Sequence, residues 1–137
     1  MPGILRLSEA TALALHAAVL AAEAGEPLRT TEMASTLAAS EAHLSKVLQT
    51  LTRAGILESK RGPNGGYVLR RDPEEVSLLD VYEALEGPIR SDGCLFSEPV
   101  CERVHCILGD LVESVRNDVS AYLKRTSLGE AARGRRR

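Results

Sequence analysis

The chain has 137 residues, of which 44% are hydrophobic and only 3% aromatic, and its formal net charge is −2 at pH 7. A chain of this length supports one compact domain with an appended element. The core must be aliphatic, because aromatic side chains are so few. The net charge argues against a generally cationic surface for nucleic acid. A transmembrane helix needs about twenty consecutive apolar residues, and no such run is present.

The net charge averages two segments of opposite character. Residues 40–71 hold six Lys or Arg against two Glu, whereas residues 72–123 hold twelve acidic residues against three Arg. We therefore expect the basic segment to meet an anionic partner and the acidic segment to face elsewhere.

The compartment follows from the N-terminus and the cysteines. The first ten residues lack the cationic region, apolar core and cleavage site of a signal peptide. Three cysteines, an odd number, are poor evidence for structural disulfides. We expect a cytoplasmic protein that has no membrane partner.

The first predicted helix runs from a cap at Ser8 to about Ala24, with Gly25 as its stop. It is rich in Ala and Leu almost all round, so we expect it to be buried on more than one side. One polar residue, His16, interrupts it. His16 is either a histidine at the surface or in an interface, or a ligand for a metal or cluster.

Two further helices predict a helix-turn-helix. Thr30 or Thr31 caps the first, over residues 32–37, and Ser40 caps the second, which ends before Gly55. In the second helix, a buried face is predicted by apolar residues at three- and four-residue steps, namely Leu44, Val47, Leu48 and Leu51. The opposite face is polar and carries His43, Ser45, Lys46, Gln49 and Arg53. A helical bundle that never touches nucleic acid would show the same pattern.

The next segment predicts a cationic β-hairpin. Residues 56–59 and 67–69 are strand-like, and the intervening Gly62-Pro63-Asn64-Gly65-Gly66 predicts a turn. Lys60 and Arg61 come directly before this turn. A helix for the major groove followed by such a hairpin is typical of a winged helix-turn-helix that binds DNA. The predicted fold class is mostly α with a small β-hairpin wing.

This hypothesis gives each polar group of the basic segment a role. Phosphates would be neutralised, with salt-dependent affinity, by Lys46, Arg53 and Lys60. Base edges in the major groove would be reached by His43, Ser45 and Gln49. Arg61, on the wing, would enter a narrow minor groove.

A helix predicted over residues 78–85, capped by Ser77, leads to a segment with three cysteines, Cys94, Cys101 and Cys106, and with His105 beside the last. Six residues separate the first two cysteines and four the next two, so the CxxC spacing of a zinc ribbon is absent. Three thiolates in about a dozen residues can still wrap one soft metal centre, such as an iron–sulfur cluster, zinc or copper(I). The alternative is that these cysteines are small buried hydrophobic residues.

The last predicted helix begins near Val104, and its apolar stripe runs from Ile107 to Leu123. The stripe either packs on its own domain or forms the seam of a homodimer. DNA recognition favours the dimer, because a two-fold protein reads two half-sites. Residues 127–137, which end in four Arg among the last five positions, are expected to form a basic flexible tail.

With these motifs, the chain resembles the IscR-like superfamily of bacterial winged-helix regulators over about residues 5–130. The most specific motif is the wing, Arg61-Gly62-Pro63-Asn64-Gly65-Gly66-Tyr67. The other matching segments are Leu5-Arg6-Leu7-Ser8, residues 44–51, Ala54-Gly55-Ile56-Leu57, Leu78-Leu79-Asp80-Val81 and the three-cysteine segment.

The resemblance implies a homodimeric transcription factor, often a repressor, that binds a double-stranded, pseudo-palindromic operator. It implies an iron–sulfur cluster that controls DNA binding in response to redox state, nitric oxide or iron supply. Its cluster ligands would be Cys94, Cys101 and Cys106, with a two-iron and a four-iron cluster both open. Residues at base-contacting positions would be Ala42, His43 and Ser45, with Arg61 on the wing.

The fourth cluster ligand departs from the family pattern. Where some members have a His three residues after the last cysteine, this chain has Gly109. Other members take an acidic residue from the partner's first helix, sometimes with a His one turn later. Those positions hold Ala12 and His16 here. The fourth ligand is therefore His16 from the partner subunit, His105, or an exogenous thiol or water.

The predicted organisation is a winged helix-turn-helix domain over residues 1–86, a cluster loop over 87–106, a dimerisation helix over 107–126 and the tail. Two alternatives stay open: a regulator whose cysteines form a disulfide without a cluster, and a zinc-stabilised winged helix that binds protein. An enzyme is not expected, since the sequence offers no nucleophile–base set, phosphate-binding Gly loop or paired carboxylates.

Overall fold

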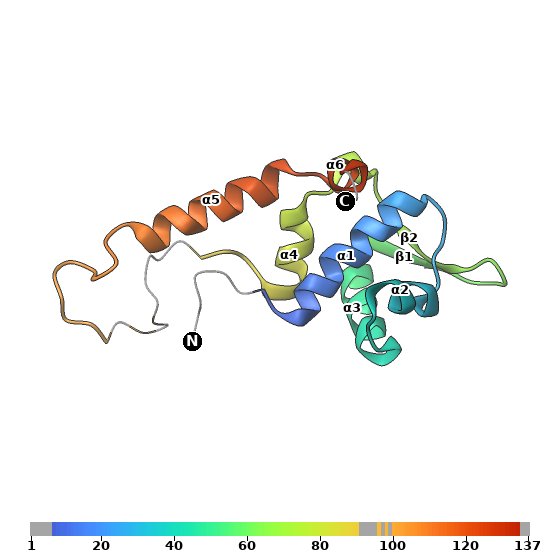
Figure 1. The fold of residues 1–137 in the computed structure, drawn as a ribbon, viewed down its shortest axis with the longest axis horizontal. Coiled ribbons are helices and arrows are strands. Elements are labelled where there is room, and N and C mark those ends of the chain that lie inside the picture. Colours follow the sequence, from blue (N-terminus) through green and yellow to red (C-terminus); the bar gives the residue numbers. More distant parts are fainter. Residues whose placement is uncertain (1–6, 91–95, 97, 99, 135–137) are drawn as a thin grey trace.

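The computed structural model describes residues 7–90, 96, 98 and 100–134. Its elements in chain order are α1 (Glu9–Ala24), α2 (Thr30–Leu37), α3 (Glu41–Arg53), β1 (Leu57–Lys60), β2 (Gly66–Leu69), the short 3-10 helix η1 (Pro73–Glu75), α4 (Leu78–Glu86), α5 (Leu111–Arg125) and α6 (Leu128–Arg133). The antiparallel β1–β2 hairpin projects from one side of a helical body, and α5 extends away on the other (Figure 1). The predicted fold class, mostly helical with a hairpin wing, is confirmed.

Helix α1 lies at the centre of the body and contacts α3, α4 and α6. Its alanines at positions 14, 17, 18 and 21 are at most 1% exposed. Side chains this small let the neighbouring helices approach the α1 backbone closely, and large aliphatic residues fill the space around them. The fully buried ones include Leu44, Leu48, Leu51, Val81 and Leu128. The aliphatic core expected from the composition is therefore present.

Polar groups join the start of α1 to the end of α4. Ser8 caps α1 as predicted, because its side chain accepts the N–H of Thr11 at 3.1 Å. Thr11 is fully buried, and its hydroxyl donates to Oε1 of Glu86 at 2.6 Å. The Ser8 N–H donates to the same oxygen at 3.3 Å. A buried hydroxyl is thereby satisfied while two distant segments are held together.

Two predicted helix starts were wrong. Helix α2 begins at Thr30, and Arg29 occupies the N-cap position instead of Thr30 or Thr31, since the Arg29 N–H is satisfied by Oε2 of Glu32 at 3.1 Å. Helix α5 begins at Leu111, not near Val104 or at 107. Gly109 has a φ of +55°, a left-handed conformation that cannot belong to a continuous right-handed helix. Residues 106–110 therefore form turns, and the Gly109 N–H donates to the Cys106 carbonyl at 3.0 Å.

The flexible tail expected over residues 127–137 was wrong as far as residue 134. Ser127 caps α6 by accepting the Glu130 N–H at 3.0 Å, and Leu128 is fully buried. On either side of Ser127, the backbone pairs with the segment before α4. Leu78 donates to the Thr126 carbonyl at 2.9 Å, and Leu128 donates to the Val76 carbonyl at 2.8 Å. Burial of Leu128 and these two backbone hydrogen bonds therefore hold residues 127–134 in place, although this segment has no periodic pattern of apolar residues. Residues 135–137 lie outside the described part.

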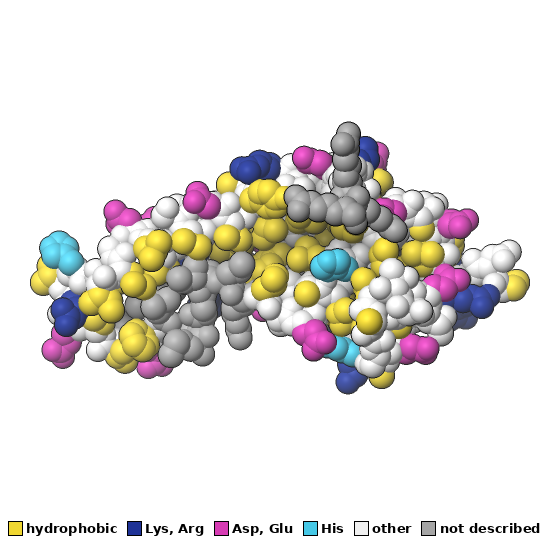
Figure 2. Space-filling model, in the orientation of Figure 1, with side chains coloured by type: hydrophobic (Ala, Val, Ile, Leu, Met, Phe, Trp, Pro, Cys, Tyr) yellow, Lys and Arg dark blue, Asp and Glu magenta, His cyan; other side chains and the backbone are white. Residues whose placement is uncertain are grey.

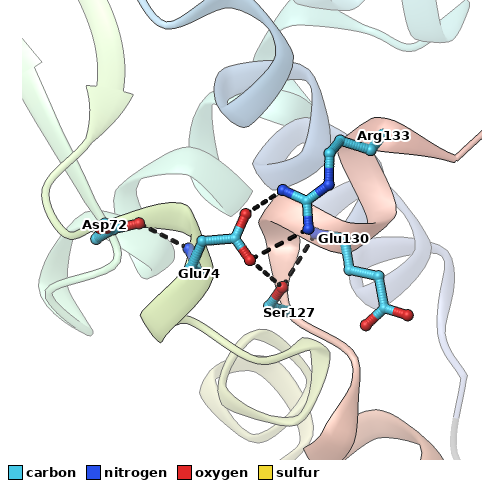
Figure 3. A network of polar contacts seen from close by, with 5 residues as sticks. All are labelled: Asp72, Glu74, Ser127, Glu130 and Arg133. Carbon is cyan, nitrogen blue, oxygen red and sulfur yellow. Dashed lines mark hydrogen bonds and ion pairs between the residues drawn. The ribbon is translucent and has the colours of Figure 1, made fainter.

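An ion pair closes α6 onto η1 (Figure 3). The guanidinium of Arg133 donates to both carboxylate oxygens of Glu74, and the Ser127 hydroxyl donates to Oε2 of Glu74 at 3.3 Å. These hydrogen bonds and the charge of Arg133 hold the pKa of the Glu74 carboxyl below its ordinary value of 4.5. The pair joins the C-terminal helix to the segment that follows the wing.

The Glu74–Arg133 pair predicts a pH-dependent contribution to stability. A carboxyl whose pKa is lowered on folding stabilises the native state above its ordinary pKa and loses that contribution as the pH falls through the folded value. Arg133→Gln should lower the thermal midpoint at pH 7, and the difference from the unmodified chain should shrink as the pH falls below 4.5. Calorimetry at several pH values measures this. Arg125→Gln, which removes an equal charge that has no contact with Glu74, is the control. A difference in thermal midpoint that stays the same at every pH would contradict a stabilising Glu74–Arg133 pair.

Candidate nucleic-acid interface and cysteine segment

Helix α3 presents one buried face and one polar face, as predicted. Ser40 caps it by accepting the His43 N–H at 3.1 Å, and the leucines and valine of the inner face are at most 2% exposed. On the outer face, the exposed candidate residues are Ala42, Lys46, Gln49 and Arg53. His43 and Ser45 are half-buried. The side chains proposed to meet DNA are therefore displayed along one helix while its opposite face anchors it to α1.

The wing is a hairpin with fixed register. Leu57 pairs with Leu69, and Lys60 pairs with Gly66 at the turn end. The turn closes when the Gly65 N–H donates to the Gly62 carbonyl at 2.9 Å. Gly66 has a φ of +149°, and a Cβ there would lie 2.4 Å from the Leu28 carbonyl oxygen. Only glycine permits this approach, which explains why the predicted turn ends in two glycines.

The two cations of the wing differ in availability. Nζ of Lys60 lies 3.0 Å from a carboxylate oxygen of Glu58, and both side chains are roughly half exposed to solvent, at 54% and 41%. Arg61 is exposed and has no ion-pair partner among the described residues. An anion that binds Lys60 must compete with Glu58, whereas Arg61 has no such competitor among the described residues.

The connector between α1 and α2 holds the wing at two points, and sequence reasoning missed both. Leu28 and Tyr67 exchange backbone hydrogen bonds of 2.9 and 2.8 Å, which adds a one-residue bridge to β2. Farther out, the guanidinium of Arg29 donates to the Pro63 carbonyl at the tip of the wing. Nothing in the local pattern signals a contact between residues 34 positions apart. The connector therefore sets the direction of the wing relative to α3.

The candidate ligands for a metal or cluster are described only in part. Cys101, Cys106 and His105 are exposed, and Cys94 lies outside the described residues. The Leu108 N–H donates to Sγ of Cys106 at 3.4 Å. Across the residues that the structure describes, no three His, Cys, Asp or Glu side chains lie close enough together to hold a metal ion. The structure thus does not bring His16 and His105 together with the two described thiols.

His16 lies on the exposed side of α1, at an apolar groove of about 440 Å³ between α1, α2, α4 and α6. Its Nδ1 is 2.7 Å from the Ala12 carbonyl oxygen. Because a carbonyl only accepts, Nδ1 carries a proton in this contact, and in the neutral tautomer the lone pair is on Nε2. A backbone carbonyl on the other ring nitrogen is the usual arrangement for a ligating histidine. His16 is therefore prepared to ligate from its accessible side.

Apolar side chains are also exposed on and before α5. Five of them are more than half exposed, namely Val100, Val104, Ile107, Leu111 and Tyr122. Figure 2 shows hydrophobic side chains in a band along the α5 arm and onto the adjoining body. In the part of the chain that the structure describes, no helix has the length and hydrophobicity needed to span a membrane.

The contact between Arg29 and Pro63 predicts a local effect on the wing. Removing it with Arg29→Ala should lower the local stability of the turn by about 1 kcal/mol, since the bond is exposed. Exchange of the Gly65 amide hydrogen should then become roughly fivefold faster, because this is the free-energy change expressed as a rate ratio. Hydrogen exchange followed by NMR measures it, with Arg70→Ala, at the other end of β2, as the control. Equal Gly65 exchange in both variants would contradict the contact.

Comparison with known proteins agrees with this geometry. Residues 7–134 match the model of the Rrf2 family, described as an iron-dependent transcriptional regulator. The chain is 40% identical over 91 residues to the protein aau3 of Rhizobium meliloti (strain 1021), a match that covers 66% of this chain and 59% of that protein. It thus spans about three fifths of the length of that relative.

Two regulators named CymR are also similar. The HTH-type transcriptional regulator CymR of Bacillus subtilis (strain 168) is 33% identical over 114 residues, which cover 82% of this chain and 78% of that protein. The solved structure of B. subtilis CymR, titled the global cysteine regulator, superposes with a TM-score of 0.78 and 29% identity and covers 93% of this chain and 96% of the other. The oxidized form of Staphylococcus aureus CymR superposes with a TM-score of 0.76 and 25% identity, with 97% and 100% covered. The protein belongs to the Rrf2 family of DNA-binding winged-helix transcriptional regulators.

Proposed function

We propose that this regulator is a homodimeric repressor that binds a pseudo-palindromic operator through α3 and the wing. We further propose that an iron–sulfur cluster on its cysteine segment controls its affinity for DNA. The observation that carries the DNA contact is the pairing of an outward polar face on α3 with the unpaired Arg61 on a wing whose direction is fixed. The proposal is that each protomer reads one half-site.

The proposed contacts divide by chemistry. The half-buried His43 and Ser45 and the exposed Gln49 supply hydrogen-bonding groups for base edges, and Ala42 offers a methyl group for a thymine methyl. Lys46, Arg53 and Lys60 supply charge for phosphates, and Lys60 must first leave Glu58. Arg61 enters the minor groove, where a narrow, A·T-rich segment has the most negative potential.

The proposed homodimer rests on the apolar surface of α5. On this helix, Leu111 and Tyr122 are more than half exposed. Beside them lie three half-buried apolar residues, Val115, Val119 and Leu123. An apolar surface of this kind is suited to burial against a second copy of the chain. A two-fold arrangement would place two α3 helices on half-sites about 34 Å apart, or a multiple of this.

The proposed cluster rests on the donor chemistry and on the iron-dependent description of the family. Cys101 and Cys106 are free, exposed thiols on a segment without regular structure, so both can turn toward one centre. The Leu108 N–H on Cys106 is the kind of bond that tunes cluster sulfurs. Cys94 would be the third ligand, and the fourth would be His16 of the partner subunit or His105. When bound, the cluster would supply a change of charge and ligation in response to redox state, nitric oxide or iron supply.

A route from the cysteine segment to the wing supports control of DNA binding. The segment runs directly into α5, and the end of α5 is joined by backbone hydrogen bonds at Thr126 and Leu128 to residues 76–78. Residues 76–78 follow the wing and begin α4. A cluster that orders the cysteine segment would therefore favour one placement of α5 relative to the wing, and it acts only if the two placements differ in DNA affinity.

A cluster-free thiol switch is the second candidate, favoured by the exposure of both described thiols and by the likeness to an oxidized CymR. In this case two of the three cysteines form a disulfide, and two electrons and two protons pass to an oxidant such as a peroxide. The same route through α5 would carry the signal.

Replacement of Arg61 tests the wing contact. Arg61→Ala should weaken duplex binding about tenfold at fixed salt and reduce the preference for sites with a narrow minor groove. Fluorescence anisotropy on duplexes obtained by selection with the unmodified chain measures both quantities. Arg125→Ala, a change of equal charge on α5, should leave them unchanged. If affinity and groove preference both survive in Arg61→Ala, the wing does not contact DNA as proposed.

Anaerobic purification tests the cluster. The protein should absorb visible light and contain iron and acid-labile sulfide, and Cys101→Ala should lose all three signals, because a thiolate ligand is removed. His16→Ala should weaken cluster retention if the partner's first helix supplies the fourth ligand. A colourless protein that stays colourless after reconstitution, and that forms a disulfide with peroxide by mass spectrometry, would replace the cluster with the thiol switch.

A further inference from the structure

A groove of about 300 Å³ lies between α3 and the inner face of the wing. Its lining comes from the second half of α3 and from both strands, namely Gln49, Thr52, Arg53, Ser59 and Tyr67. We propose that this groove holds a backbone phosphate of the DNA strand that separates the major groove from the minor groove, with Tyr67 and Ser59 as hydrogen-bond donors. The inference rests on the proposed function, in which α3 and the wing enter adjacent grooves.

The hairpin register aims these two side chains at α3. Ser59 and Tyr67 are directly paired across the strands, two positions out from the pair Leu57 and Leu69. Side chains two residues apart on a strand share a face. Leu57 is 1% exposed in the core, so Ser59 and Tyr67 face the body on the same side, farther toward the tip. Glu58, whose carboxylate would repel a phosphate, belongs to the opposite face.

The groove offers donors that nothing else uses. Within the described residues, the hydroxyls of Ser59 and Tyr67 and the side-chain amide of Gln49 have no hydrogen-bond partner. Arg53 gives one contact to the Thr50 hydroxyl at 3.3 Å and keeps its other N–H groups. Thr52 differs, since its hydroxyl donates to the Leu48 carbonyl at 2.8 Å. One guanidinium and two hydroxyls, with no carboxylate in the lining, suit a phosphodiester, while Gln49 beside them stays available for a base edge.

The topology explains why a phosphate belongs there. A protein that places a helix in the major groove and a hairpin in the next minor groove must straddle one sugar–phosphate strand. The space between helix and hairpin receives that strand, and contacts to it fix register without reading sequence. Tyr67 is well suited to this role, because its ring packs against the core and its backbone is held by Leu28. The donor is therefore positioned before DNA arrives.

Tyr67→Phe removes only the hydroxyl and keeps the packed ring, so it tests the proposal without disturbing the fold. Affinity should fall about three- to tenfold on every duplex, the range expected for one hydrogen bond. The dependence of affinity on salt should stay unchanged, because no charge is lost. Ser59→Ala should behave alike, whereas Arg53→Gln should also reduce the salt slope by about one. Ser114→Ala, which removes an exposed hydroxyl from α5, is the matched control and should leave affinity unchanged.

A scan with methylphosphonates locates the contact. Duplexes obtained by selection, each with one phosphate made neutral, are measured by anisotropy with the unmodified chain and with Tyr67→Phe. One phosphate per half-site lies between the bases read by α3 and the minor groove at the wing. There, neutralising the phosphate and removing the Tyr67 hydroxyl should have non-additive effects on the free energy of binding. Additive losses at every position, or unchanged affinity in Tyr67→Phe, would overturn the inference. Should Arg61→Ala still weaken binding, the proposed function would stand without it. Absence of salt-dependent duplex binding by the unmodified chain would overturn both.

Discussion

The close approach of helices to α1 is the constraint on which the rest of the structure depends. The alanines at positions 14, 17, 18 and 21 leave almost no side-chain volume between α1 and its neighbours. A larger residue at any of them would push α3, α4 or α6 outward, since protein interiors are close-packed and accommodate extra volume poorly. With α3 held by its leucines, its polar face is the only one left for solvent or DNA. The core thus determines which side of the molecule is functional.

The wing shows how a small hairpin acquires a direction. A two-stranded hairpin alone is marginally stable in water, and its turn of glycines is free to adopt many conformations. Here the Leu28–Tyr67 bridge and the Arg29–Pro63 contact connect it to the start of α2. Helix α2 also contacts α3, so a continuous set of contacts joins the wing to α3. If α3 and the wing enter adjacent grooves as proposed, elements held in this way need no ordering on binding, which lowers the entropic cost.

The C-terminal third of the chain has a different character. Residues 101–107 are exposed, with Val104 92% exposed and both Cys101 and Cys106 at the surface. At the far end of α5 the chain is instead fixed, through Thr126, Leu128 and the Glu74–Arg133 pair, beside the segment that follows the wing. A chemical change at Cys101 or Cys106 would thus act on exposed residues that lead into α5, whose far end is fixed. A cluster and a disulfide would both act through α5 in this way.

The elements set by local pattern were predictable. The leucine spacing and Ser40 cap of α3, the Gly-rich turn of the wing and the Ala-rich α1 each follow from propensity, capping and periodicity, which act over a few residues. The predicted DNA-contacting residues of α3 lie along its outer side for the same reason.

The tertiary structure alone decided what depends on distant partners. Helix α6 forms because Leu128 enters the core and its backbone pairs with Val76. The direction of the wing and the groove beside Tyr67 are likewise invisible in a linear pattern. The sequence by itself determined the winged helix-turn-helix and its basic surface. The orientation of the wing relative to α3 was decided by contacts between residues far apart in the chain, for which local propensity has no signal.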